Sequence, residues 1–293
     1  MEIGIALPTM CRGYDRASTV EWCRLADAGP VSSVSCGERM TFHNAEMWTT
    51  LAAAAALTER VRIIANVSVL PAHPVALVAK QAATIDVLSA GRFTLGVGVG
   101  GRGADYRSLG SGSQRRHDRL DRAVAELRSL WAGEPPFDGA DPVGPPCVQA
   151  GGPPVLAGAL GPKSLARAAR WADGVVAFSV GGSPEEIAWS AEAARRAFAD
   201  AGRDAPRLVS GCFYTLGVAE PDTVLRDFTE EYLGFLGAGN AAAAAAAMKT
   251  FEADALHRTL DAAEAAGLDE FILVPGSPGV PVLEETLELI GSR

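Results

Sequence analysis

Short apolar runs alternate with longer stretches of helical character along all 293 residues of the chain. The apolar runs are nearly continuous, which is typical of parallel strands that are covered on both faces. Glycine and proline separate these runs from the helical stretches. The pattern predicts eight strand-then-helix units, with strands at 3–7, 33–36, 61–70, 93–99, 155–157, 175–178, 208–218 and 271–274.

Eight such units favour an α/β fold, a single closed (β/α)8 TIM barrel, because closure removes both edges of the sheet. An open, doubly wound sheet is the alternative. We expect one domain over residues 1–293, since one barrel accommodates a chain of this length. The segment at about 133–154 holds seven prolines and is predicted to be an insertion outside the barrel. Two helices are expected after the seventh strand, over 223–235 and 241–266.

Composition and charge exclude several classes of function. The formal net charge of −9 argues against binding to nucleic acids or anionic membranes, because both need a basic face. Five widely spaced cysteines without a CxxC pair indicate reduced thiols. The chain shows no signal-peptide pattern and no apolar run long enough for a membrane span. We therefore expect a cytoplasmic protein with a small-molecule substrate and, as one option, a homodimeric state.

A glycine-rich segment follows the predicted fourth strand. Gly98 and Gly100 interrupt its apolar end, and Arg102 follows them. Glycine lets backbone N–H groups approach a ligand closely, and the nearby cation favours an anion. The alternative is a tight turn between a strand and a helix, which has the same composition.

A second glycine loop follows the predicted fifth strand. Leu160 and Gly161 precede a helix that begins near Pro162, and Ser164 lies in its first turn. The free N–H groups of that turn and the Ser164 hydroxyl can hold a phosphate. Arg102 or Lys163 would be the supporting cation, and an ordinary turn is again the alternative.

Ionisable side chains are scarce where the predicted strands end. Only four histidines occur in the chain, and no cluster has the spacing of a metal site. A serine-nucleophile elbow is missing, as is a strand-end lysine for a barrel aldolase or isomerase. A site of this kind favours chemistry carried out by a bound cofactor.

Several segments in a fixed order make the chain resemble the bacterial-luciferase-like family of flavin- or deazaflavin-dependent oxidoreductases. They are EIGIALP (2–8), LAAAAALTERVR (51–62), LPAHPV (70–75), AKQAATIDVLSAGRFTLGVGVG (79–100), AARWADG (168–174) and DEFILV (269–274). The longest of these segments, over 79–100, is the most specific. The resemblance implies a TIM barrel that binds FMN or coenzyme F420 at its mouth.

The resemblance also implies roles for individual residues. A cis peptide bond without proline is expected at Asn66–Val67, behind the tricyclic ring of the cofactor. The loop at Leu160 and Gly161, with Ser164, matches the phosphate site of the family. These positions join Gly98, Gly100 and Arg102 as expected cofactor-binding residues.

The chain departs from the family where many members carry an acidic residue and a histidine after the second strand. Here the pair is Glu38 and Arg39, and a guanidinium cannot act as a general base. Arg39 is expected either to pair with Glu38 or to be a fixed positive charge near the cofactor or substrate. His43 is a further catalytic candidate, whereas His73 is expected to be structural.

A second departure concerns the cofactor. Deazaflavin-dependent sugar dehydrogenases of the group have a glutamate after the fourth strand, where this chain has Gly101. This difference favours FMN over F420. The sequence thus predicts a flavin-dependent oxidoreductase of the monooxygenase type, without a metal and with an unidentified small organic substrate. The alternatives are a non-catalytic flavin-binding protein of the same fold and an F420-dependent dehydrogenase or reductase.

Overall fold

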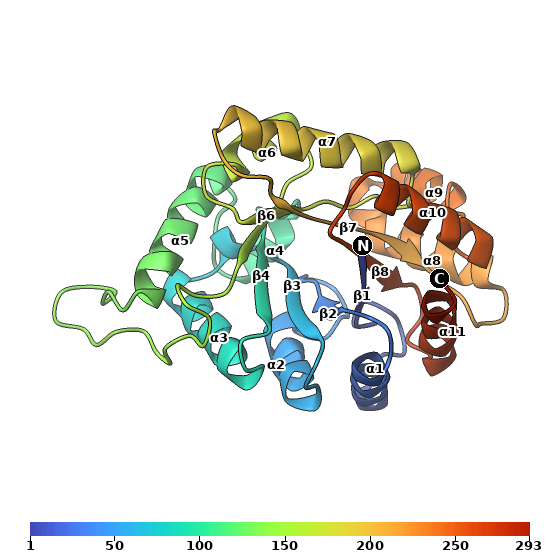
Figure 1. Cartoon of the computed structure of the whole chain (residues 1–293), viewed down its shortest axis with the longest axis horizontal. Coiled ribbons are helices and arrows are strands. Elements are labelled where there is room, and N and C mark those ends of the chain that lie inside the picture. Colours follow the sequence, from blue (N-terminus) through green and yellow to red (C-terminus); the bar gives the residue numbers. More distant parts are fainter.

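Eight parallel strands close into one barrel in the computed structural model, which describes residues 1–293 (Figure 1). The strands pair in chain order, and β8 pairs back to β1 with Glu2 opposite Glu270. The predicted TIM barrel is therefore confirmed, and the open sheet is excluded. The strands are β1 (Glu2–Ala6), β2 (Ser33–Cys36), β3 (Arg62–Ser68), β4 (Phe93–Val97), β5 (Val155–Gly158), β6 (Gly174–Val176), β7 (Arg207–Tyr214) and β8 (Glu270–Pro275).

Helices surround the barrel, and each crossover between neighbouring strands contains at least one (Figure 1). None of them combines the length and the apolar character that crossing a membrane requires. They are α1 (Arg16–Ala28), α2 (Met47–Leu57), α3 (Val75–Leu88), α4 (Gly103–Ser108), α5 (Arg116–Trp131), α6 (Pro162–Ala168), α7 (Pro184–Asp200), α8 (Pro221–Leu233), α9 (Ala238–Ala246), α10 (Ala253–Ala265) and α11 (Val280–Gly291), with short 3-10 turns η1 (Leu70–Ala72) and η2 (Gly234–Leu236).

The single helix expected over 241–266 is wrong, because α9 and α10 are separate helices. Between them, Thr250 binds the end of β7: its hydroxyl donates to the Phe213 carbonyl at 2.5 Å, and its carbonyl accepts from the Thr215 amide at 3.2 Å. Met248 in the same connection is fully buried. Contacts with a distant strand thus interrupt a helical sequence pattern.

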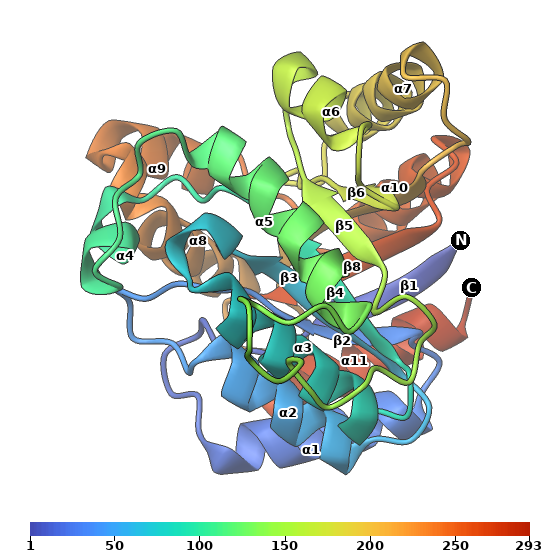
Figure 2. The ribbon, with the colours of Figure 1, turned by 90° about the vertical axis from the view of Figure 1, so that its left-hand side faces the viewer.

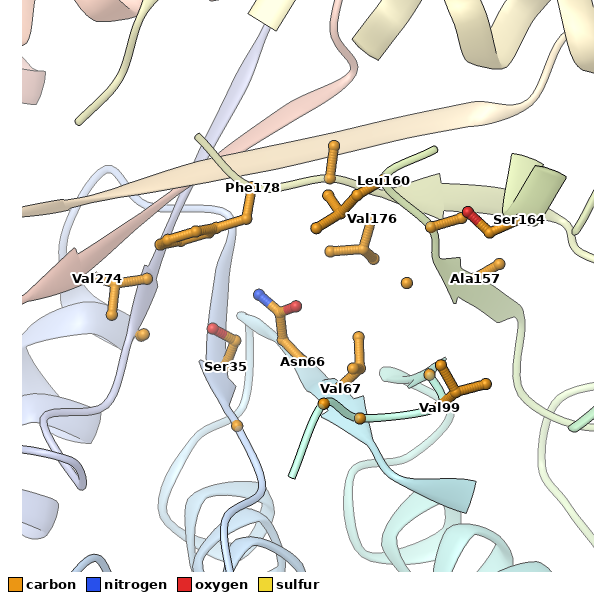
Figure 3. Close-up of a pocket in the computed structure, with 18 of the residues that line it drawn as sticks. Ser35, Asn66, Val67, Val99, Ala157, Leu160, Ser164, Val176, Phe178 and Val274 are labelled. Atoms are coloured by element: carbon orange, nitrogen blue, oxygen red, sulfur yellow. The ribbon is translucent and has the colours of Figure 1, made fainter. Parts of the chain in front are cut away.

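The interior of the barrel holds a thin apolar layer. Ile64, Val176, Val209 and Ile272 belong to one small cluster of buried side chains that point inward from different strands. Val176 is visible in Figure 3, across the cavity from Asn66 and Val67. This layer separates the two ends of the barrel, so that each end has its own chemistry.

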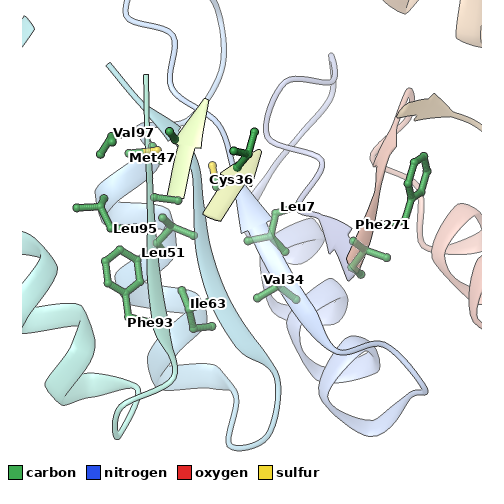
Figure 4. Packing of buried hydrophobic residues seen from close by; sticks show 14 of the residues in the cluster. Leu7, Val34, Cys36, Met47, Leu51, Ile63, Phe93, Leu95, Val97 and Phe271 are labelled. Atoms are coloured by element: carbon green, nitrogen blue, oxygen red, sulfur yellow. The ribbon is translucent and has the colours of Figure 1, made fainter. Parts of the chain in front are cut away.

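The main core lies between the outside of the strands and the helices. Figure 4 shows Val34, Ile63 and Phe93 from three strands packed with Met47 and Leu51 of α2. All five side chains are buried. The near-continuous apolar runs of the sequence follow from this arrangement, because alternate strand residues face the two apolar regions.

A polar network fills the amino-terminal end of the barrel. Glu270 of β8 has a fully buried side chain and forms ion pairs with Arg62 at 3.1 Å and Arg207 at 3.0 Å. The same carboxylate accepts hydrogen bonds from Ser33 at 2.5 Å and Ser32 at 2.8 Å. A buried charge is tolerated only with such partners. The network therefore stabilises the amino-terminal end of the barrel, which lies opposite the mouth.

The proline-rich segment lies between the end of α5 and β5, at the amino-terminal ends of the strands, and contains neither helix nor strand. Figure 2 shows it in green, running in front of α3. Its last part is fixed by Asp86, whose carboxylate accepts from the amides of Val148 at 2.7 Å and Gln149 at 3.0 Å. The segment is therefore remote from the carboxyl ends of the strands.

Candidate functional site

A cavity of about 540 Å³ lies at the carboxyl ends of the strands (Figure 3). Its walls come from all eight strand ends and from α5, α6 and α8, and most of them are apolar. Active sites of TIM barrels occupy this end. The side chains with hydrogen-bonding groups in its wall include Thr9, Ser35, Asn66, His117, Asp121, Ser164, Arg167 and Tyr232.

The floor of the cavity is shaped by an irregularity in β3. The register between β3 and β4 shifts between Ala65 and Ser68, and the peptide bond between Asn66 and Val67 is cis. The expected cis bond is therefore confirmed. Asn66 and Val67 both line the cavity, as predicted for residues that face a cofactor.

Glycines that follow β4 and the glycine that ends β5 accommodate this irregularity. A Cβ atom at Gly98 would lie 3.0 Å from Val67, and one at Gly158 would lie 3.3 Å from it. A Cβ atom at Gly100, where φ is +59°, would lie 2.9 Å from Val69. Gly98 and Gly100 also line the cavity, and their role in binding a ligand stays a prediction. Packing against Val67 and Val69 already explains why neither position has a side chain.

Glu38 does not line the cavity. Its carboxylate is 2% exposed and binds the amide of Val69 at 2.5 Å and Nε2 of His73 at 2.6 Å. Ser68 is a weaker third partner at 3.3 Å. These bonds fix the turn that follows β3, because every oxygen of the buried carboxylate is occupied. Glu38 and His73 therefore hold the backbone on which Asn66 and Val67 depend.

Arg39 forms no ion pair with Glu38, so that expectation is wrong. The residue is 7% exposed, and its guanidinium lies over the rings of Phe42 at 3.7 Å and Tyr232 at 4.7 Å. Its Nη1 donates to the carbonyl of Tyr232 at 2.9 Å, at the carboxyl end of α8. A cation is favourable at that end of a helix and on aromatic faces. Arg39 thus fastens α8 to the loop after β2.

His43 and Arg102 also lie outside the cavity wall. His43 is 28% exposed at its side chain, with Nδ1 at 3.9 Å from Glu231. Arg102 pairs with Asp105 at 3.2 Å and donates to the carbonyl of Thr41 at 3.2 Å. Arg102 is therefore engaged in joining α4 to the loop after β2. Helix α4 was not predicted from the sequence pattern, because glycines lie at and around its ends.

The loop between β5 and α6 forms one end of the cavity. Leu160, Gly161 and Ser164 line it, as expected for the predicted phosphate site. The Ser164 hydroxyl accepts from the Gly161 amide at 3.1 Å and donates to the Gly161 carbonyl at 2.8 Å. Helix α6 begins here with Pro162 at its first position, and the cavity wall includes Gly161 before it and Ser164 in its first turn.

The cation at this end is Arg167 rather than Arg102 or Lys163. Arg167 lines the cavity and pairs with Asp121 at 2.6 Å and with Asp118 at 2.7 Å. Hydrogen bonding to Asp118, together with the charge of Asp121, raises the pKa of Arg167. Lys163 is exposed and absent from the cavity wall. Sequence reasoning missed Arg167 although it lies three residues after Ser164, on the same helical face.

Aromatic side chains form the other end of the cavity. Phe178 and Phe213 have ring centroids 4.9 Å apart, and Phe213 and Tyr232 have centroids 5.1 Å apart. Burial raises the pKa of the Tyr232 phenol, so this group stays protonated around neutral pH. Cys36 lies below Thr9, and burial raises the pKa of its thiol to about 12. This end therefore offers an apolar, uncharged surface.

The structure has no group of three or more His, Cys, Asp or Glu side chains placed to hold a metal ion. All five cysteines are free, and four of them are buried. The cavity therefore has two different ends. One end is polar, with the Arg167 guanidinium, the Ser164 hydroxyl and the start of α6, and the other end is aromatic and has no charged side chain in its wall. Such a division suits a ligand with an anionic group joined to a flat ring system.

Comparison with solved structures shows the same fold over the whole chain. Monooxygenase RslO1 from Streptomyces bottropensis covers 100% of this chain and 98% of its own, with a TM-score of 0.78 and 21% identity. An F420-dependent secondary alcohol dehydrogenase with an F420–acetone adduct gives a TM-score of 0.75 and 18% identity, over 99% of this chain and 98% of its own. The FMN-bound oxygenating constituent of 3,6-diketocamphane monooxygenase from Pseudomonas putida gives 0.72 and 17%, over 99% and 96%.

Comparison with known sequences identifies the family. Pyrimidine monooxygenase RutA of Escherichia coli is 39% identical over 103 residues, which are 33% of this chain and 28% of RutA. The chain thus matches less than a third of the length of that relative. The sequence model of the luciferase-like monooxygenases, in contrast, matches residues 1–288. The chain therefore belongs to the family of luciferase-like monooxygenases.

Proposed function

We propose that this protein is a flavin-dependent oxidoreductase of the monooxygenase type, which binds reduced FMN in the barrel mouth and acts on a small, uncharged organic substrate. The observation that carries the proposal is the division of the cavity. Arg167 and Ser164 stand at one end, and Phe178, Phe213 and Tyr232 stand at the other. Membership in the luciferase-like monooxygenase family supports the same reading.

The residues present fit a flavin. A volume of about 540 Å³ lies within the range of roughly 300–1,000 Å³ that is usual for cofactor sites. The Ser164 hydroxyl, the amides at the start of α6 and the Arg167 guanidinium would hold the phosphate. The backbone at Asn66 and Val67 would support the ring from below.

Arg167 would have to change partners when a phosphate binds. Its guanidinium is occupied by two carboxylates, of which Asp118 also pairs with Arg115 at 3.3 Å. Asp121 is held in addition by the indole N–H of Trp171 at 3.0 Å. Asp118 is therefore the partner that a phosphate would replace, because its carboxylate keeps a second cation and lies at the surface.

The chain's own residues would orient the substrate and exclude water. A bound flavin supplies hydride transfer or the activation of O2. Phe178, Phe213 and Tyr232 enclose the space opposite the phosphate end, where an apolar wall keeps water from the reacting groups. The protonated Tyr232 phenol can donate a hydrogen bond but cannot accept a proton. The substrate class that fits is uncharged, because no ionised side chain faces this end.

FMN is the proposed cofactor, with F420 as the alternative. Gly101 lines the cavity, and a Cβ atom there would meet only Phe235, at 3.9 Å. A glutamate would fit this position, yet the chain has none there. The two carboxylates around Arg167 also disfavour the several negative charges of an F420 tail.

A non-catalytic flavin-binding protein is the second candidate. It is favoured by the positions of Glu38, Arg39 and His43, none of which lines the cavity. Turnover of a reduced flavin together with an organic substrate separates the two candidates.

A homodimer and a cytoplasmic location stay predictions. Helix α3 exposes the apolar side chains of Leu77 and Leu88, which a second copy of the chain would cover in a dimer.

The proposal is tested by titrating the protein with FMN, F420 and riboflavin, followed by absorbance and fluorescence. We expect FMN to bind, and Arg167→Ala to weaken its binding about 10- to 100-fold, since a charge-assisted bond contributes about 1.5–3 kcal/mol. Riboflavin, which lacks the phosphate, should be affected much less. Lys163→Ala is the matched control, because Lys163 is a cation of the same helix outside the cavity. Absence of flavin and F420 binding by the parent protein would refute the proposed function.

A further inference from the structure

Ser35 of β2 carries a buried hydroxyl without a partner. The residue is 0% exposed, and its Oγ makes no hydrogen bond within the protein. It lines the cavity, and Figure 3 shows its side chain among the residues of the cavity wall, on β2. Buried polar groups nearly always have a partner, so a hydroxyl that lacks one and also lines a cavity calls for a ligand that supplies it.

Asn66 of β3 presents a second polar group to the same space. Ser35 pairs in register with Ile64, so Asn66 stands one inward position further toward the mouth on the neighbouring strand. Asn66 and Ser35 thus come from neighbouring strands, and both line the cavity, with Phe178 above them in Figure 3. The side chain of Asn66 lines the cavity and makes no hydrogen bond with another side chain. The two strands thus place a hydroxyl and an amide together on the floor.

Nothing charged accompanies this pair. Glu38 is turned toward His73 and the turn after β3, and Arg39 is directed at α8. Phe178 and Val274, which appear on the same side of the cavity in Figure 3, are apolar. A ligand group at this position is therefore uncharged and both donates and accepts hydrogen bonds.

We propose that Ser35 and Asn66 form the recognition site for the carbonyl and N–H edge of an uncharged heterocycle. The Ser35 hydroxyl donates to a ring carbonyl, while the Asn66 amide accepts from the ring N–H and donates to a carbonyl. Two sources carry this edge: the pyrimidine part of a flavin, and a pyrimidine substrate. The inference rests on the proposed function, since it names the contact that this same cavity makes with a ring.

The test compares lumiflavin with 3-methyllumiflavin, in which a methyl group replaces the ring N–H, and adds uracil as a probe of the substrate source. Binding is measured by calorimetry for the parent, Ser35→Ala and Asn66→Ala, with uracil titrated into protein with and without FMN. Ser210→Ala is the matched control, because Ser210 is also a buried strand serine without a partner but lies outside the cavity wall.

We expect each of the two variants to lose about 3- to 10-fold in affinity for lumiflavin, the effect of one neutral hydrogen bond. The preference of the parent for lumiflavin over 3-methyllumiflavin should shrink in the same variants, and Ser210→Ala should change neither. An unchanged lumiflavin affinity with a 3- to 10-fold loss for uracil supports the site and assigns it to the substrate. Unchanged affinities for both probes overturn the inference.

The melting temperature of Ser35→Ala and flavin binding by the parent protein distinguish failure of this inference from failure of the proposed function. Ser35→Ala should keep or raise the melting temperature, because no hydrogen bond of the folded protein is lost; a marked decrease would assign the hydroxyl to folding and overturn the inference. A parent that binds no flavin refutes the proposed function. In that case uracil binding that is weakened by Ser35→Ala still supports the pair, and no uracil binding overturns it as well.

Discussion

Ser33 and Ser35 lie two residues apart on β2 and face the same barrel interior, yet their hydroxyls have opposite surroundings. Ser33 donates to the Glu270 carboxylate at 2.5 Å, within a network that includes Arg62 and Arg207. Ser35 has no partner at all. One serine belongs to the amino-terminal end of the barrel, where polar groups satisfy one another, and the other belongs to the mouth.

The two ends of the barrel serve different purposes, one stability and the other binding. At the amino-terminal end, the buried carboxylate of Glu270 is matched by two cations and two hydroxyls. At the mouth, Ser35 is left unsatisfied although an alanine would fold equally well. An unsatisfied group that also lines a cavity, as Ser35 does and Ser210 does not, is a candidate contact for a ligand.

The largest expected effect is the loss of the charge at the amino-terminal end. Glu270→Gln should lower the free energy of unfolding by about 3 kcal/mol, because Arg62 and Arg207 lose their buried counter-charge. FMN affinity should change little, since the apolar layer separates the two ends. Urea denaturation and FMN titration measure both quantities. Glu264→Gln, at an exposed ion pair, is the control and should be nearly neutral.

A smaller effect is expected from the hydroxyl of the same network. Ser33→Ala should destabilise the protein by about 1.5–3 kcal/mol, the range for hydrogen bonds to charged groups. Ser35→Ala should be neutral or stabilising in the same denaturation experiment. Equal losses for both serines would show that the two ends do not differ as described.

The smallest expected effect is the loss of the stabilisation from Glu2 at low pH. Hydrogen bonds from Arg62 and Arg207 lower the pKa of Glu2 from 4.5 to about 2. The stabilisation from Glu2 is therefore present above pH 4.5 and is lost as the pH falls toward 2. The contribution should stay below about 1 kcal/mol, because the Glu2 side chain is 44% exposed. Denaturation of the parent and of Glu2→Gln between pH 2 and 6 tests this: the difference in stability should vanish at the acid end.

Local sequence patterns predicted the barrel because each strand has apolar side chains on both of its faces. They failed where contacts with residues distant in the sequence determine where a strand or helix ends. The run at 93–99 was predicted too long, since β4 ends at Val97, where it pairs with the irregular part of β3. The alanine-rich pattern at 241–247 predicted a continuous helix, whereas the hydrogen bond of Thr250 to the end of β7 separates α9 from α10.

The candidate site was predicted unevenly for the same reason. Loop residues such as Gly161 and Ser164 were found, because their chemistry is visible in the local sequence. The neighbours Glu38 and Arg39 resembled a pair, but the fold turns them in different directions, toward His73 and toward Tyr232. Arg39 therefore contacts the end of α8 and does not line the cavity. Only the folded chain shows which charges reach the cavity, as for Arg167.

A crystal structure of the protein with FMN would show whether the cavity binds a flavin as proposed. We expect the phosphate between the start of α6, the Ser164 hydroxyl and Arg167, and the ring above Asn66 and Val67. The carbonyl and N–H edge of the ring, or a bound substrate, should lie against Ser35. A phosphate bound elsewhere, or a ring that leaves the floor of the cavity empty, would contradict the proposal.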